Sequence, residues 1–202
     1  MSELAGGSSG SGDPSCVDYV YRGRLVGRDF DVAYGNVKGG LQEHPLEQIT
    51  NEVLVPIAQR IRPFADQYRG FGVGAAALVE LDTGILAVLW ANNRMIAPGN
   101  DIRLTEKLCA EGGVLAKATA IEAASMLAIA ISGIPQPDKH SGVITKTLHP
   151  CGNCRDEFSI SPIVNSDTTI VTVTPWARST IRETQNLQDI LLIHNYRKLV
   201  HC

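Results

Sequence analysis

The chain has 202 residues, of which 44% are hydrophobic and 19% are charged, and these values are typical of a soluble globular protein. Its formal net charge of −3 leaves no excess of positive charge to neutralise phosphates, so a long nucleic acid is a poor candidate partner. The apolar runs are too short to cross a bilayer, and the first residues lack the cationic start and apolar core of a secretory signal. We therefore expect a cytoplasmic protein that binds a small molecule, with no nucleic acid or membrane as partner.

The chain divides by composition into three regions. Residues 1–17 include a Gly/Ser tract that buries too little apolar surface to become ordered, so we expect a disordered tail. Residues 18–45 mix aromatic and β-branched residues with glycines, which favours a short hairpin or an ordered arm. Residues 46–202 are predicted to form one domain with a C-terminal helical tail.

Hydrophobic periodicity predicts how the domain begins. Apolar residues at helical spacing predict a leading helix over 45–68, interrupted by two prolines. These apolar residues are Leu46, Ile49, Val53, Ile57 and Ile61, and the prolines are Pro56 and Pro63. Two short apolar runs at 72–80 and 84–92 follow, separated by an Asp-Thr-Gly turn, and they predict a pair of antiparallel strands.

The second half of the domain predicts alternating helices and strands. Residues 93–108 are polar and are expected to form a loop, whereas 109–132 are alanine-rich and apolar on all sides, which favours a buried helix. The remaining expected elements are a strand at 141–148, a short helix at 151–158, a strand at 168–174 and a helix at 187–196. This alternation predicts an α/β fold in which a mixed β-sheet is sandwiched by helices.

Three of the five cysteines form a pattern that suggests a metal site. Cys151 and Cys154 are three positions apart, a spacing shared by redox pairs, structural zinc sites and iron–sulfur sites. Cys109 is expected at the start of another helix, so two helix N-termini would bring three sulfurs together, where the positive ends of the helices favour thiolates. Three protein ligands leave one position for water, which is typical of catalytic zinc, although buried thiols or a structural zinc use the same residues.

Glu111 is the residue that favours a catalytic site. It follows Cys109 by two positions, so its carboxylate is poorly placed to bind the same metal but well placed to reach a water molecule on it. We expect it to carry protons between that water and a substrate. The alternative is a carboxylate that only stabilises the first turn of a helix, where Glu is common.

These motifs resemble the zinc-dependent cytidine deaminase superfamily in its three-cysteine form, in the branch of free-nucleoside cytidine deaminases and blasticidin S deaminases. The resemblance rests on Cys-Ala-Glu at 109–111, Pro-Cys-x-x-Cys at 150–154 and Phe-Gly-Val-Gly-Ala-Ala at 71–76. It implies a cytidine-deaminase-like fold, Zn²⁺ as cofactor, a homodimer or homotetramer, and residues 46–202 as the catalytic domain. The implied zinc ligands are Cys109, Cys151 and Cys154, with Glu111 as the proton carrier.

The same resemblance implies where a substrate would bind. Phe71 would contact the base, and Ala110 and His149 would line the pocket. Phe71 in the core and His149 in an ordinary hydrogen bond are the structural alternatives, at least as common for these residue types.

Two departures from the family pattern concern the sugar and the charge of the site. The Asn-x-Glu-Asn stretch that usually binds ribose is missing, and Asn92 or Asn93 is the nearest replacement. Gly112 stands where many three-cysteine relatives have an arginine that offsets the thiolate charge, which leaves Arg155 as the nearest candidate.

The sequence therefore predicts a zinc-dependent aminohydrolase that releases ammonia from a small cytosine nucleoside or nucleoside-like compound. The missing ribose motif keeps open an alternative substrate, a nucleoside antibiotic of the blasticidin S type or another aminated heterocycle. A non-catalytic binding protein stabilised by zinc is the alternative of a different class.

Overall fold

The structure is a computed structural model that describes residues 19–21, 41, 44–66, 71–84, 86–96, 106–137, 144–175 and 181–191. The predicted disordered tail, 1–17, lies outside the described residues, as does most of the predicted arm at 18–45. Within that arm, β1 (Tyr19–Tyr21) pairs antiparallel with a strand of the central sheet. The boundaries expected between the three regions stay a prediction.

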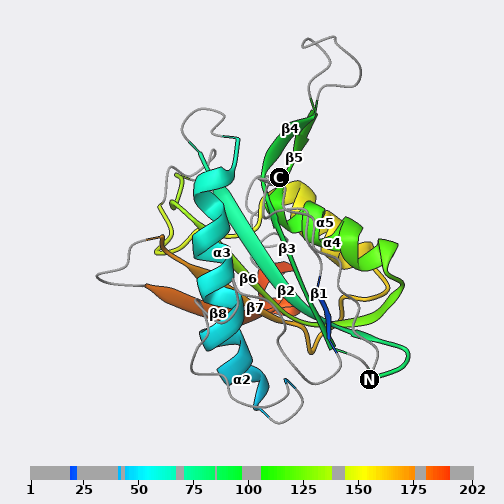
Figure 1. The fold of residues 1–202 in the computed structure, drawn as a ribbon. Coiled ribbons are helices and arrows are strands. Elements are labelled where there is room, and N and C mark those ends of the chain that lie inside the picture. Colours follow the sequence, from blue (N-terminus) through cyan, green and yellow to red (C-terminus); the bar gives the residue numbers. More distant parts are fainter. Residues whose placement is uncertain are drawn as a thin grey trace, which may run out of the picture.

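A six-stranded mixed sheet forms the centre of the described structure, with strand order β1-β3-β2-β6-β7-β8. Only the pairing between β6 and β7 is parallel; the other neighbours run antiparallel. The strands after β1 are β2 (Val73–Leu81), β3 (Leu86–Asn92), β6 (Ala123–Gly133), β7 (Thr169–Val173) and β8 (Arg182–Asn186). A separate ribbon of β4 (Arg94–Ile96) and β5 (Glu106–Leu108) extends beyond the sheet (Figure 1).

Helices cover both faces of this sheet, as Figure 1 shows for α3 and α4. One face packs against α2 (Leu46–Ile49), a π-helical turn (Thr50–Leu54) and α3 (Val55–Ile61), which is followed by a 3₁₀ turn (Arg62–Phe64). The other face packs against α4 (Ala110–Ala120) and α5 (Gly152–Ile160). Because side chains alternate along a strand, Leu78 and Ala77 belong to different apolar clusters on the two faces. The predicted α/β sandwich with a mixed sheet is confirmed.

The first half of the domain follows the sequence prediction closely. The leading helix is present and continuous over 46–64; a π-helical turn lies before Pro56 in the first turn of α3, and Pro63 lies in the final 3₁₀ turn, so the prolines do not divide it. The antiparallel pair β2 and β3 is confirmed, with Ala77 opposite Leu89. Its turn closes through a hydrogen bond from the Gly84 N–H to the Leu81 carbonyl at 2.8 Å, and Gly84 adopts φ 73°, a conformation that glycine accepts without strain.

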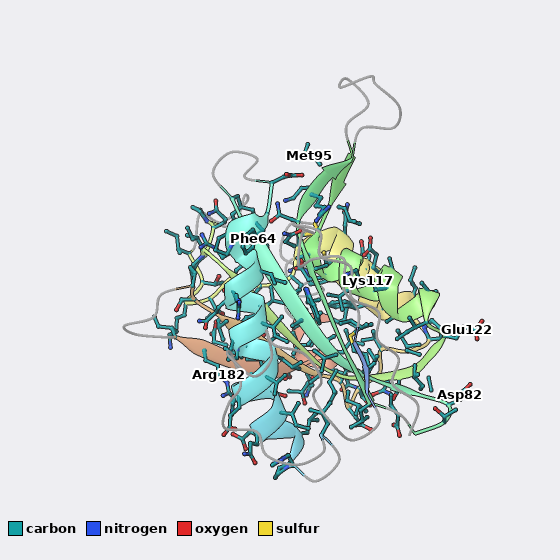
Figure 2. The ribbon with its side chains drawn as sticks, viewed as in Figure 1. Phe64, Asp82, Met95, Lys117, Glu122 and Arg182 are labelled. Carbon is teal, nitrogen blue, oxygen red and sulfur yellow. The ribbon has the colours of Figure 1, made fainter. Side chains whose placement is uncertain are left out.

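The prediction of one helix over 109–132 is wrong. Helix α4 ends at Ala120, a turn follows with Glu122 at φ 55°, and 123–133 form the central strand β6 (Figure 2 labels Glu122 at this turn). The backbone N–H groups of Ile121 and Glu122 bond to the carbonyls of Lys117 and Thr119, which closes the helix. Strand β6 is covered on both faces, so its sequence is a continuous apolar run that periodicity does not distinguish from a buried helix.

The strand expected at 141–148 is also wrong for the residues that the structure describes. Residues 145–150 have no regular secondary structure, and Ile144 makes one isolated bridge to Pro137. The loop expected at 93–108 instead contains the β4–β5 ribbon, and β8 has a polar sequence that gave no strand signal. The helix and strand expected at 151–158 and 168–174 are confirmed by α5 and β7. Of the helix expected at 187–196, residues 187–191 are helical and the rest lie outside the described residues.

Candidate metal centre

Three cysteines from two separate helix starts meet at one point of the structure. Cys109 is the N-cap of α4, Cys151 is the N-cap of α5, and Cys154 lies in the first turn of α5. The sulfur of Cys151 lies 3.6 Å from that of Cys109 and 3.4 Å from that of Cys154, and all three lie within 4.8 Å of one another. The predicted meeting of the two helix N-termini is confirmed, although the cysteines are separated by up to 45 positions along the chain.

The spacing of the sulfurs fits a zinc ion. Thiolate sulfurs that bind one Zn²⁺ at about 2.3 Å in a tetrahedron lie about 3.8 Å apart, close to the separations of Cys109, Cys151 and Cys154. Soft sulfur ligands also favour Zn²⁺ over Mg²⁺ or Ca²⁺. Among the residues that the structure describes, no other group of three or more potential ligands lies close enough together to hold a metal ion. The donor set therefore suits a zinc site with one position left for a fourth ligand.

The burial of the cysteines differs from one to the next. Cys154 is buried, Cys109 is half-buried and Cys151 is exposed. Solvent therefore reaches the cluster from the side of Cys151. A hydrogen bond from the Cys109 thiol stabilises the Cys151 thiolate, which lowers the pKa of Cys151 to about 2. The N-terminal end of α5 adds a favourable partial positive charge at the same sulfur. Hydrogen bonds among the sulfurs and the end of α5 therefore favour negative charge in this cluster.

Glu111 lies in the first turn of α4 and is 4% exposed. Burial raises the pKa of its carboxyl to about 7, because the charged form loses its hydration. The negative charge of Cys151 adds to this rise, whereas a hydrogen bond with Cys154 opposes it. The carboxyl group is therefore close enough to Cys151 and Cys154 for both to affect its pKa, and its role as proton carrier stays a prediction.

Gly112 lies beside Glu157, a flexible acidic side chain of α5. A Cβ atom on Gly112 would come within 2.9 Å of the Glu157 carboxylate of α5. Burial and the charge of Cys151 both raise the pKa of Glu157, so negative charge on this carboxyl group is disfavoured near the sulfurs. Arg155, the predicted source of positive charge, donates a hydrogen bond from Nη1 to the Pro150 carbonyl at 3.1 Å, directly before Cys151. Its electrostatic role stays a prediction.

A second cation near the cluster was missed by the sequence analysis. Lys107 of β5 lowers the pKa of both Cys151 and Glu111 through its charge, and its ammonium nitrogen lies 5.2 Å from the centre of the Phe71 ring. The signal was present in the sequence, because Lys107 stands only two positions before Cys109. Because the sequence predicted a loop over these residues, it did not place Lys107 beside the cysteines.

The remaining candidate residues have defined surroundings. Phe71 is half-buried and packs on the apolar cluster under α4 and α5, to which the fully buried Ala110 also belongs. His149 is half-buried, and its Nε2 lies 3.2 Å from a carboxylate oxygen of Glu183 on β8. The hydrogen-bonded histidine that we considered as an alternative is therefore present. The contacts among the described residues do not test whether Phe71, Ala110 and His149 bind a substrate, so these roles stay predictions.

The two asparagines considered for sugar binding differ in whether a side-chain hydrogen-bonding group is still without a partner. Asn93 uses its side chain to hold the backbone, accepting from the Val73 N–H and donating to the carbonyls of Asp66 and Phe71 at 3.0 and 3.3 Å. Asn92 is 2% exposed and accepts a hydrogen bond from Arg94 Nε at 3.2 Å, while its amide nitrogen has no partner among the described residues. Of the two, Asn92 keeps a hydrogen-bond donor.

Comparison with solved structures gives the following similarities. The chain is similar to cytidine deaminases. The enzyme from Burkholderia pseudomallei has 24% sequence identity over 68% of this chain and 92% of its own, with a TM-score of 0.47. The enzyme from Mycobacterium tuberculosis has 26% identity over 68% and 90%, with a TM-score of 0.44. That from Mycobacterium leprae has 23% identity over 68% and 93%, with a TM-score of 0.43.

Sequence comparisons add no further relative, since no protein-family profile and no curated protein matches the chain. Among the residues that the structure describes, no helix has the length and apolar character needed to span a membrane.

Proposed function

We propose that this protein is a zinc-dependent hydrolytic deaminase that acts on a small cytosine nucleoside or a nucleoside-like compound. The observation that carries the proposal is the convergence of Cys109, Cys151 and Cys154 at two helix N-termini, with the buried carboxyl group of Glu111 against their sulfurs. A structural zinc site usually has four protein ligands, whereas the residues that the structure describes supply three, with Glu111 close by as the proposed proton carrier.

The residues of the chain have separate tasks in this reaction. Zinc bound by the three sulfurs supplies a Lewis acid that makes water a stronger nucleophile. Glu111 accepts one proton from the attacking water and passes it to a ring nitrogen of the substrate; it then takes the second proton from the added hydroxyl group and delivers it to the amino group that leaves as ammonia. In the balanced reaction, a carbon–oxygen bond to water forms and the carbon–nitrogen bond to the amino group breaks. No oxidant or reductant is needed.

The surroundings of the cluster favour a small and uncharged ring as substrate. The half-buried Phe71 offers an aromatic surface, and Lys107 over its ring faces the same region. The net charge of −3 argues against a long polyanion, as the sequence already suggested. We expect a homodimer or homotetramer in solution, which size-exclusion chromatography with light scattering measures directly.

Replacing Glu111 by Gln tests the proton carrier. The amide has nearly the same shape but does not transfer protons, so we expect the rate of ammonia release to fall by about 10²–10⁴-fold while zinc content and melting temperature stay unchanged. The matched control is Asp156→Asn, which removes one exposed carboxylate from α5 and should leave the rate unchanged. Deamination at the wild-type rate by Glu111→Gln would refute the mechanism.

A panel of substrates tests the chemical class. Cytidine, deoxycytidine and blasticidin S are compared by loss of absorbance and by release of ammonia, and we expect weak activity on plain cytidine because the usual ribose motif is missing. Asn92→Ala should raise KM if its unpaired amide donor holds the sugar, whereas Asn93→Ala should mainly lower stability. Faster turnover of single-stranded DNA or of a nucleoside monophosphate than of every nucleoside would overturn the assignment.

The same panel distinguishes the enzyme from a binding protein that is only stabilised by zinc. A chain with about one zinc per molecule that binds nucleosides yet releases no ammonia from any of them would favour the binding protein.

A further inference from the structure

Strand β8 is a polar strand at the edge of the sheet, and one of its side chains points to the face that holds the metal centre. The sequence of β8, Arg-Glu-Thr-Gln-Asn, has no apolar residue. Its position comes from pairing with β7, where Glu183 lies directly opposite Thr172. Thr172 neighbours Ile131 on β6, which belongs to the apolar cluster under α4 and α5. Glu183 is therefore placed on the α4 and α5 face.

The carboxylate of Glu183 binds the loop that leads into Cys151. One oxygen accepts a hydrogen bond from the Thr147 hydroxyl and lies 3.2 Å from His149 Nε2. The Thr147 hydroxyl also bonds to that of Thr172 at 2.6 Å, and both threonines are 0% exposed. Burial opposes the charge of Glu183, but the hydrogen bonds from Thr147 and His149 outweigh it, and the pKa of the carboxyl is lowered.

The loop held in this way has no regular structure of its own. Residues 145–150 form neither a helix nor a strand, yet they end at Cys151, the exposed ligand. The Leu148 side chain packs closely on Gly133 of β6, where a Cβ atom added to the glycine would lie only 2.2 Å from it. On the far side of the loop, Arg155 donates to the Pro150 carbonyl. Hydrogen bonds therefore hold this loop at two places, to Glu183 of the sheet and to Arg155 of α5.

We propose that Glu183 is a positioning residue for the metal centre, which places the sulfur of Cys151 through its hydrogen bonds to Thr147 and His149. This inference rests on the proposed zinc site. Residues that orient a metal ligand without touching the metal typically change metal affinity by about 10–100-fold when they are removed. Loss of the Glu183 carboxylate would leave the Thr147 hydroxyl and the His149 ring without this partner and would let the loop shift Cys151.

The experiment measures metal binding to the full chain, so it does not depend on turnover. Wild type, Glu183→Leu and Glu183→Gln are titrated with Zn²⁺ against a chromophoric chelator, and their Co²⁺ forms are compared by the sulfur-to-cobalt absorption band. We expect Glu183→Leu to weaken Zn²⁺ binding by about 10-fold or more and to alter the Co²⁺ band. Glu183→Gln keeps an oxygen that accepts both hydrogen bonds, so it should restore most of the affinity.

The matched control is Gln185→Leu, a change on the same side of β8 that removes no hydrogen bond to the loop. It should leave zinc affinity unchanged, which separates positioning from a general weakening of the strand. Should Glu183→Leu fail to fold, Thr147→Val and Thr147→Ser decide the matter, because only Ser keeps the hydroxyl that bonds to Glu183. We then expect several-fold weaker Zn²⁺ binding in Thr147→Val and none of that loss in Thr147→Ser.

The outcomes separate this inference from the proposed function. Wild-type protein that binds no zinc would remove both. Wild-type protein that binds zinc, together with folded Glu183→Leu or Thr147→Val protein of unchanged affinity and unchanged Co²⁺ spectrum, would remove only the positioning role of Glu183.

Discussion

The two helices that bring the cysteines together are held in place by different forces. Helix α4, which begins after Cys109, contacts β2, β3 and β6, and its residues Ala110, Val114 and Ala118 are all 0% exposed. Helix α5 buries only Cys154 and Phe158, and the loop before it is held mainly by hydrogen bonds to side chains. Apolar packing therefore fixes one half of the metal centre, and polar contacts fix the other half.

This difference implies that the two halves fail in different ways. Close packing tolerates little change in volume, so the α4 half should respond to added atoms. Hydrogen bonds to a loop contribute individually about 0.5–1.5 kcal/mol and depend on direction, so the α5 half should respond to the loss of single polar groups. Three substitutions, from the largest expected effect to the smallest, test this view.

The largest effect is expected from Cys151→Ser, which removes the exposed ligand. Zinc content should fall from about one per chain to below about a tenth, since two thiolates hold the ion much more weakly than three. Melting temperature should fall as well, because the free energy of metal binding stabilises the folded state. Elemental analysis and thermal unfolding measure both, with Asp156→Asn, a change at an exposed residue of α5, as the control. Full zinc content in Cys151→Ser protein would contradict the assignment of this ligand.

A smaller effect on stability is expected from Gly113→Ala, in the half that depends on packing. The added Cβ would come within 2.8 Å of the Ala91 Cβ on β3, so α4 and β3 must separate slightly. Adding atoms to a packed interface typically costs about 1–3 kcal/mol of unfolding free energy. Denaturant unfolding measures this loss, and an unchanged midpoint would mean that α4 is held less tightly than its burial indicates.

The smallest effect is expected from Gly152→Ala, the corresponding change at the start of α5. No atom lies within 4 Å of the added Cβ, so no clash opposes the substitution. Ala also restricts the unfolded chain more than Gly, and we expect the protein to be unchanged or stabilised by up to about 1 kcal/mol. Measured beside Gly113→Ala, this variant sharpens the contrast between the helices. A loss of stability equal to that of Gly113→Ala would remove the contrast.

The sequence predicted the fold class and the convergence of the three cysteines, but it misassigned individual elements of the fold. Cys109, Glu111, Cys151 and Cys154 were predicted to gather at two helix starts, because spacing and capping positions are local properties of the chain. Strand β6 was mistaken for part of a helix, because a strand buried on both faces has no alternation of polar and apolar residues. The turn at Glu122 that separates it from α4 uses a residue that rarely adopts positive φ, so it gave no turn signal.

By itself, the sequence determined the chemical groups of the candidate site: three thiols and one carboxyl group, each beside a helix start that lowers the free energy of negative charge. The tertiary structure alone decided what surrounds them. Strand β8 has no apolar residue and forms only because β7 offers an unpaired edge, and Glu183 reaches Thr147 and His149 only once that pairing exists. Such contacts join residues more than 30 positions apart. No local pattern encodes them, because the partners meet only after β8 has paired with β7.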